Sequence, residues 1–367
     1  MKVSKISNTL KNEDFQRRIV PFLSVLLGFI IGAIVMAFSG YDPIQAYSEL
    51  LKGAGFYGNI KRFGDTLLTM TSLVLTGLSV SFAFKTGLFN IGAPGQMLMG
   101  GFIAVYIGVV FELPRIIHLP FAVISAALLG AVWAFLPGLL KAKFRINEVV
   151  TAIMMNWIAY WSVYYFVPAK IPGNFNTESA VIKNTASLRT EWLSKLFKGS
   201  YVNLGFFIAI IAAILVWWIL EKTTFGYELK AVGFNAHAAE YAGMKVNRNI
   251  ILSMMISGAL SGLAGAVYYL GYGNNIKIGE LPSQGFDGIA VALLGLNSPI
   301  GVVFSSFLFG FMNAGKLFMN AATEVPKELI EIIIAVIIFF AAANLMIKGI
   351  LSKINKGLDR NGGGSNA

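Results

Sequence analysis

Three uncharged amide side chains are the residues of this sequence best suited to hold a small polar molecule. Asn90 and Gln96 lie in GLFNIGAPGQMLMGG at 87–101, and Asn156 lies beside Trp157 in another apolar run. A buried amide without a hydrogen-bond partner costs several kcal/mol, so each of these groups needs a partner. That partner is either backbone exposed at a bend or a passing solute, with Trp157 available for stacking.

Pro94 and the glycines around it predict a bend in segment 87–101. Proline lacks a backbone N–H and disfavours helix at the preceding residue, while glycine lets the chain turn sharply. One interpretation is a kinked helix whose amides cap broken backbone, and the other is a pathway lined by uncharged hydrogen-bonding groups. The residues favour neither, and helix packing explains Asn156 and Trp157 equally well.

A single carboxylate, Asp287, stands in a second glycine-rich segment, GFDGIAVALLG. At the start of a short apolar helix it is expected to be an N-cap or first-turn residue, because the helix dipole stabilises negative charge there. Contact with substrate, or gating, is the less favoured alternative. Segments 87–101 and 285–301 share glycines and an internal proline, and such paired broken helices often form the substrate site of a transporter.

The polar stretch GFNAHAAEYAGMK at 233–245 is interpreted as a surface helix that docks on another protein. Asn235 can cap a helix over 236–242, and Gly243 can end it. The stretch lacks the large apolar face that a helix lying on lipid needs, so a protein partner is the better interpretation. The residues expected at that contact are Ala236, His237, Ala238, Ala239, Glu240, Ala242, Gly243 and Lys245.

Nucleotide binding and hydrolysis find no support in the sequence. GFMNAGK at 310–316 has the glycine spacing and lysine of a phosphate-binding loop. However, Leu317 stands where the magnesium-binding hydroxyl residue belongs, and no strand precedes the run. The only histidines, His118 and His237, are far apart, and there is no cysteine. We therefore expect a chain that is not an enzyme and binds no cofactor itself.

Uncharged runs of 19 to 28 residues define the elements that position these groups. About 20 apolar residues cross a hydrocarbon core as a helix, and only a helix satisfies the backbone in such a run. The sequence therefore predicts an all-α, polytopic transmembrane bundle of eight to ten spans. The ten candidates are 19–38, 64–84, 88–110, 118–140, 149–167, 203–220, 249–271, 286–297, 300–318 and 328–347, of which the eighth is short enough to be re-entrant.

Lysine and arginine predict the orientation of the chain. One set of loops together with both tails holds 17 of them, and the opposite loops hold 11. The richer side is expected to face the cytoplasm. This places tails 1–18 and 348–367 and loop 221–248 inside, and loop 168–202 outside, around a membrane domain at 19–347. The net charge of +11 is spread over these loops, which suits anionic lipid better than nucleic acid.

Two further patterns concern the packing of the helices. Gly28–Gly32 and Gly258–Gly262 have the GxxxG spacing of close helix contacts. Five aromatic residues at helical spacing form either an interfacial belt or a packed face between helices. They are Trp157, Tyr160, Trp161, Tyr164 and Tyr165.

Several segments in register resemble the permease subunits of ATP-binding-cassette (ABC) importers. AAEYAG matches the Ala-Ala-three-residues-Gly core by which those permeases dock on their ATPase, with His237 in place of the usual acidic residue. Over residues 60 to 315, the chain resembles permeases for ribose-type sugars and for nucleosides. The matching segments are FNIGAPGQMLMGG, RINEVVTAIMMNW, LKAVGFNAHAAEYAG, SGALSGLAGA and GFDGIAVALLG. INEVVTAIMMNW and GFNAHAAEYAG resemble the nucleoside branch most.

The resemblance implies a type II ABC importer fold and a role as one of two permease subunits of a nucleoside importer in the bacterial cell membrane. Its implied partners are a cytoplasmic ATPase that binds ATP and magnesium, a second homologous permease, and an extracellular substrate-binding lipoprotein that docks on 168–202. The implied coupling helix is 236–243. The pathway candidates are Asn90, Gln96, Asn156, Trp157 and Asp287. The alternatives are a permease for ribose-type sugars, an ion-coupled secondary transporter, and a membrane scaffold that moves nothing.

Overall fold

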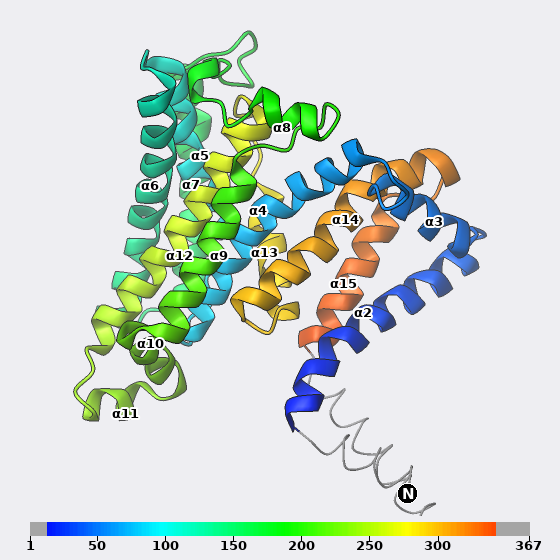
Figure 1. Cartoon of the computed structure of the whole chain (residues 1–367). Coiled ribbons are helices and arrows are strands. Elements are labelled where there is room, and N and C mark those ends of the chain that lie inside the picture. The colour runs from blue at the N-terminus through cyan, green and yellow to red at the C-terminus, as the bar shows by residue number, and fades with distance from the viewer. Residues whose placement is uncertain (1–12, 343–367) are drawn as a thin grey trace, which may run out of the picture. The chain divides into compact units, whose positions relative to one another are not determined.

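The structure is a computed structural model that describes residues 13–342. The chain divides into two compact units, and Figure 1 shows that the described part of each is built of helices. The core unit holds residues 51–315, and the described part of the terminal unit holds 13–50 and 316–342. The only extended pairing among the described residues is two isolated β-bridges, Pro172 with Ser179 and Glu178 with Lys277.

Seven helices among the described residues are long and apolar enough to cross a membrane, which confirms the polytopic helical fold. Six of them are regular α-helices, and α12 (Val246–Tyr268) continues into a π-helical turn, η2 (Tyr269–Gly273). The other six are α2 (Glu13–Phe38), α4 (Ile60–Lys85), α5 (Ala93–Val110), α6 (Arg115–Phe144), α9 (Gly205–Lys222) and α14 (Pro299–Thr323).

Three of the ten expected spans are not among these seven. α7 (Glu148–Lys170) has 23 residues, but its tyrosines, tryptophans and Asn156 lower its mean hydropathy. α13 (Ser283–Leu294) has 12 residues, so it is about 18 Å long and too short to cross a core of about 30 Å. α15 is described over Glu328–Ala342. The rest of that span, and both expected tails except residues 13–18, lie outside the described residues.

The remaining helices are short and connect the long ones. α10 (Thr224–Phe234) and α11 (Ala236–Tyr241) precede the N-terminal end of α12. The segment between α7 and α9 folds over the other end of α12 and contains η1 (Asn184–Ala186) and α8 (Glu191–Leu196). α3 (Pro43–Gly53) follows α2.

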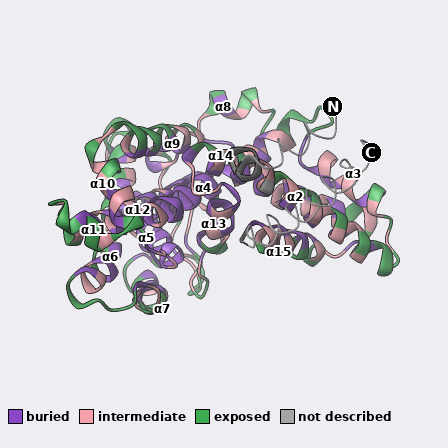
Figure 2. Ribbon diagram, turned by 90° about the horizontal axis from the view of Figure 1, so that it is seen from below, coloured by how far each residue is buried: buried purple, intermediate pink, exposed green. Residues whose placement is uncertain are grey.

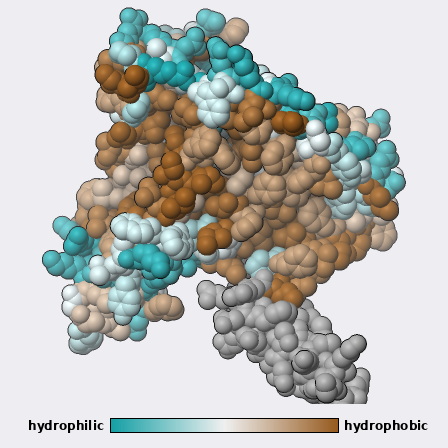
Figure 3. Space-filling view, in the orientation of Figure 1, coloured by the Kyte–Doolittle hydropathy of each residue, from teal (hydrophilic) through white to brown (hydrophobic). Residues whose placement is uncertain are grey.

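Burial divides the core unit into central and peripheral helices. Over an apolar stretch of 18 residues, α4 and α5 are buried at 78% and 72% of positions, whereas α6 is buried at only 22%. Figure 2 shows the same contrast in colour. On this unit, Figure 3 shows a hydrophobic surface between hydrophilic ends, which is the distribution that a lipid environment requires.

Glycines allow α6 and α12 to pack backbone against backbone. A Cβ added at Gly258 meets the carbonyl oxygen of Gly130, and one added at Gly262 meets that of Ala126. In the terminal unit, the side chains of Ile337 and Ile333 of α15 pack directly on Gly28 and Gly32. Both GxxxG pairs therefore mark close helix contacts, as predicted.

Pro94 starts a helix instead of bending one. The expected span from 88 is wrong at its beginning, because α4 ends at Lys85, residues 86–92 are not helical, and α5 begins at Ala93. Proline is well tolerated in a first turn, where its missing N–H has no intrahelical acceptor. Gly285 of α13 packs directly on Pro94, so the two glycine-rich segments touch at this point.

Two other local expectations are settled by helix boundaries. α13 begins at Ser283, so Asp287 is its fifth residue and is neither an N-cap nor a first-turn residue. Residues 310–316, which imitate a phosphate-binding loop, lie inside α14. A continuous helix uses its backbone N–H groups internally, so they cannot form a phosphate cradle.

Candidate functional site

The loop before α12 carries a short, well-capped surface helix, α11. The side chain of Asn235 accepts a hydrogen bond from the backbone N–H of Ala238 at 3.1 Å. At the other end, Gly243 adopts φ +82°, and the N–H of Met244 donates to the carbonyl of Ala239 at 3.0 Å. A side chain other than glycine rarely adopts this φ. The predicted cap and stop residues are both confirmed.

The exposed face of α11 differs from the expected one in one residue. Ala239 is buried at 4% exposure, so it faces its own chain and is not available to a partner. Ala238 and Ala242 are exposed. Beside them lie two aromatic side chains that were not among the residues expected at this contact, Phe234 at 91% and Tyr241 at 94% exposure. Exposed apolar side chains that gather at one place mark a contact with another protein or with a membrane.

A groove of about 820 Å³ separates α11 from the end of α6 and holds a surplus of positive charge. His237 and Glu240 line its α11 side. The basic residues that line it are Lys141, Lys143, Arg145, Lys245 and Arg248. Lys141 is neutralised by Glu148 at 2.7 Å. The remaining charge favours a partner surface that presents carboxylates.

The surface loop is packed against the break between α4 and α5. Gly233, near the end of α10, lies so close to Lys85 that an added Cβ meets the lysine carbonyl oxygen. Gly87 lies against the same glycine and has φ +73°. Glu228 of α10 also accepts a hydrogen bond from Asn249 of α12 at 2.8 Å. The loop is therefore in direct contact with the end of α4 and with Gly87 in the break.

Asn90 and Gln96 form a reciprocal amide pair at this break. Asn90 Nδ2 donates to Gln96 Oε1 at 2.8 Å, and Gln96 Nε2 donates back to Asn90 Oδ1 at 3.0 Å. Asn90 also donates to Ser257 Oγ of α12 at 2.7 Å and accepts from the N–H of Gly92 at 3.0 Å. Both side chains are buried, at 0% and 1% exposure. The pair thus joins the α4–α5 break to α12.

Asn156 of α7 caps the same break from the opposite direction. Its side-chain oxygen accepts from the N–H of Gly95 at 2.9 Å, and its Nδ2 donates to the carbonyl of Ile91 at 3.0 Å. The structure therefore brings three of the five pathway candidates together. Each of these amides is hydrogen-bonded to the backbone or to another amide. This arrangement corresponds to the interpretation in which amides cap broken backbone.

The other two pathway candidates lie apart from this cluster. Trp157 is 54% exposed on α7 and lines an open apolar groove of about 550 Å³ with Trp161 and Tyr165. Asp287 is partly buried in the second turn of α13. Four of the five aromatic residues of the α7 stripe are exposed, which favours a face toward lipid or another subunit over a packed internal face.

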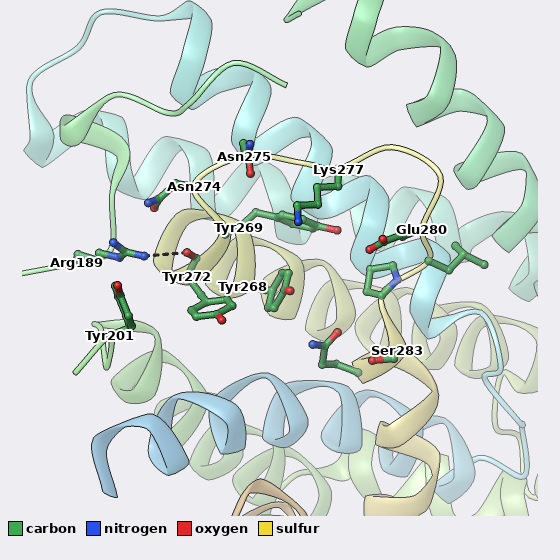
Figure 4. Close-up of a pocket in the computed structure, with 14 residues that line it drawn as sticks. Arg189, Tyr201, Tyr268, Tyr269, Tyr272, Asn274, Asn275, Lys277, Glu280 and Ser283 are labelled. Carbon is green, nitrogen blue, oxygen red and sulfur yellow. Dashed lines mark hydrogen bonds between the residues drawn. The ribbon is translucent and has the colours of Figure 1, made fainter. Parts of the chain in front are cut away.

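A cavity of about 870 Å³, which was not anticipated from the sequence, opens at the C-terminal end of α12. Figure 4 shows three tyrosines of α12 and η2 between Arg189 and Tyr201 on one side and Glu280 and Ser283 on the other. The tyrosine-rich run AVYYLGYGNN was the available signal. α12 with η2 spans 28 residues, so this cavity and α11 lie about 40 Å apart along one helix.

Comparison with known proteins gives a consistent family. The family described as "branched-chain amino acid transport system / permease component" matches residues 63–342. The guanosine ABC transporter permease protein NupP of Bacillus subtilis (strain 168) is 44% identical over 92% of this chain and 97% of its own length. The chain belongs to this permease family.

Two other relatives of this permease are named for different solutes, nucleosides and glucose. The nucleoside ABC transporter permease protein NupB of Lactococcus lactis subsp. cremoris (strain MG1363) is 40% identical over 93% of this chain and 95% of its own. The glucose ABC transporter permease protein TsgB13 of Haloferax volcanii is 30% identical over 89% of this chain and 88% of its own.

Membership of the family confirms the main expectations from the sequence. The permease is a multi-pass membrane protein and a transport subunit, not an enzyme. A permease of an ABC transporter works with an ATPase, which supplies the energy, and with a substrate-binding partner. The alternatives of an ion-coupled transporter and of a scaffold that moves nothing are therefore set aside.

Proposed function

We propose that this chain is one of two permease subunits of a bacterial ABC importer for nucleosides. The observation that carries the proposal is the identity of 44% and 40% to a guanosine and a nucleoside permease over nearly the whole chain. Identity to the glucose permease is lower, at 30%. Ribose-type sugars are the second candidate, because neutral, polar lining groups suit both kinds of solute.

The ATPase partner docks on α11 and on the basic groove beside it. Ala238, Ala242, Phe234 and Tyr241 offer small and apolar contacts, and the groove offers a positive surface. ATP and magnesium are bound by that partner and not by this chain. Rotation of α10 and α11 on closure of the ATPases presses on Lys85 and Gly87 through Gly233 and so reaches the α4–α5 break.

The buried amides border the translocation pathway. Asn90, Gln96 and Asn156 lie where α4, α5, α7 and α12 meet. In the closed arrangement they bond one another and backbone. Separation of these helices during transport exposes the same donors and acceptors to a neutral polar solute at little cost, because each lost bond is replaced by one to the solute or to water.

The orientation follows from the distribution of basic residues. Both termini and the α11 loop face the cytoplasm, and segment 168–202 faces outward and receives the substrate-binding lipoprotein. In that segment Lys183 pairs with Glu112 at 2.8 Å, and this hydrogen bond together with the lysine charge holds the pKa of the exposed Glu112 carboxyl below its usual value. A second, homologous permease completes the membrane part of the importer.

The proposal is tested by uptake of labelled guanosine, uridine, ribose and glucose into cells with and without this chain. Ion gradients are collapsed while ATP is maintained, so that only ATP-driven import is measured. We expect loss of guanosine or uridine uptake alone on deletion. Loss of sugar uptake alone moves the permease to the sugar branch, and unchanged uptake of all four overturns the substrate proposal.

A further inference from the structure

The cavity at the C-terminal end of α12 is built around a π-helical turn. The N–H of Asn274 donates to the carbonyl of Tyr269 at 2.9 Å, five residues earlier, and Asn274 itself adopts φ +59°. A π-helical turn is rare and often found at functional sites, because it widens the helix and redirects its side chains. Here it places Tyr268, Tyr269 and Tyr272 along one wall.

Arg189 holds this turn in a fixed shape. Its Nε donates to the carbonyl of Gly271 at 2.9 Å, and its Nη2 donates to the carbonyl of Tyr272 at 2.8 Å, the bond drawn in Figure 4. These carbonyls lie at a helix end, where they lack intrahelical partners and where positive charge is favourable. The same guanidinium lies 4.6 Å from the ring centroid of Tyr201. The wall is therefore formed before any ligand binds.

The aromatic rings of the cavity offer stacking surfaces. The Tyr272 centroid is 5.8 Å from that of Tyr268 and 6.1 Å from that of Tyr201, and Tyr272 is 47% exposed. Stacking of a base on an aromatic side chain contributes roughly 1–3 kcal/mol. The planes of Tyr268 and Tyr201 are inclined to that of Tyr272 by 50° and 83°, so the two rings fix Tyr272 from its sides and its exposed face is the one on which a flat heterocycle can stack.

The polar residues of the cavity complement the rest of a nucleoside. Asn274 and Gln284 each carry a donor and an acceptor in one plane, the arrangement that pairs with the edge of a base. Gln284 also hydrogen-bonds to the side chain of Tyr268, which leaves its remaining donor and acceptor positions for a base. Glu280 is exposed on the opposite rim and can accept hydrogen bonds from the hydroxyls of ribose. Asn275 is committed in part, because it donates to Glu178 at 3.0 Å.

We propose that this cavity is the site at which the permease first holds a nucleoside, with the base against Tyr272, its edge on Asn274 and Gln284, and its ribose hydroxyls on Glu280. The inference rests on the proposed function, and it adds the place and chemistry of recognition. The cavity lies at the end of α12 opposite the α11 loop, which is the end where substrate enters. Its volume of about 870 Å³ lies in the usual range for small-molecule sites.

The test is uptake of guanosine by the complete transporter in proteoliposomes, with and without single substitutions. We expect Tyr272→Ala to raise the KM about tenfold or more, since one stacking contact is lost, and Tyr272→Phe to restore the value. Tyr164→Ala is the matched control, because Tyr164 is also 47% exposed but lies on α7, away from the cavity. Thermal melting of each purified variant verifies its folding.

A second variant tests the ribose contact separately. Glu280→Gln is expected to reduce the preference for guanosine over 2′,3′-dideoxyguanosine severalfold, because the lost carboxylate serves only the hydroxyls. An unchanged KM in Tyr272→Ala together with an unchanged preference in Glu280→Gln overturns the site assignment while nucleoside import stands. If the unmodified transporter carries neither guanosine nor uridine, the proposed function itself fails.

Discussion

Asn90 illustrates how one amide can connect three helices. Its side chain bonds Gln96 at the start of α5, Ser257 in α12 and the N–H of Gly92 in the break itself. Ser257 in turn donates to the carbonyl of Ser79 in α4 at 2.7 Å. A buried network with every member paired is stabilising, whereas removal of one member leaves several groups unpaired.

Substitution of Asn90 by alanine is expected to destabilise the permease. Gln96 and the Gly92 N–H lose their partners in a site without access to water, which costs roughly 2–4 kcal/mol. The melting temperature of the purified transporter should fall by several degrees. Asn174→Ala, at an exposed amide in the segment between α7 and α9, serves as the control and should leave the melting temperature unchanged. An equal melting temperature for both variants contradicts the structural importance of the cluster.

At the scale of elements, α11 shows how adjacent residues of one helix acquire different roles. Ala238 is exposed and Ala239 is buried, although both are small and both match the family pattern. Consecutive helical residues point about 100° apart, so a two-turn helix has one face toward its own chain and another toward a partner. Only the exposed face is available for the proposed contact with the ATPase.

Two tryptophan substitutions separate these roles. Ala238→Trp is expected to weaken binding of the ATPase at least tenfold and abolish uptake, while the melting temperature of the permease stays unchanged. Ala239→Trp overpacks a buried site and should lower the melting temperature as well. Affinity is measured by co-purification at graded ATPase concentrations, with Ala169→Trp at the exposed end of α7 as control. Full ATPase binding by Ala238→Trp refutes docking on this face.

At the scale of the whole molecule, the absence of cysteine makes the proposed orientation directly measurable. A single cysteine is introduced at Asn174 or at Ala242, both of which are exposed in the structure. With an impermeant maleimide on intact cells, Asn174→Cys should be labelled, and Ala242→Cys should be labelled only after permeabilisation. The reverse pattern inverts the topology, and labelling of both from one side contradicts the number of crossings between them.

The sequence by itself determined the features that depend on local chemistry. Uncharged runs require helices in lipid, Asn235 and Gly243 delimit α11 through their own caps, and GxxxG pairs report close contacts because only a missing side chain permits them. The family also follows from local segments in register. Each of these signals is contained in a stretch of a few residues to about 20.

Only the tertiary structure decided the features that depend on distant neighbours. It shows that Asn90 bonds both Gln96 and Ser257 and that Ala239 faces inward. It also assembles the tyrosine cavity by bringing Arg189 and Tyr201 onto the stretch 268–284. The physical reason is that burial and hydrogen-bond pairing depend on which helices pack together, and sequence spacing along one helix does not contain that information.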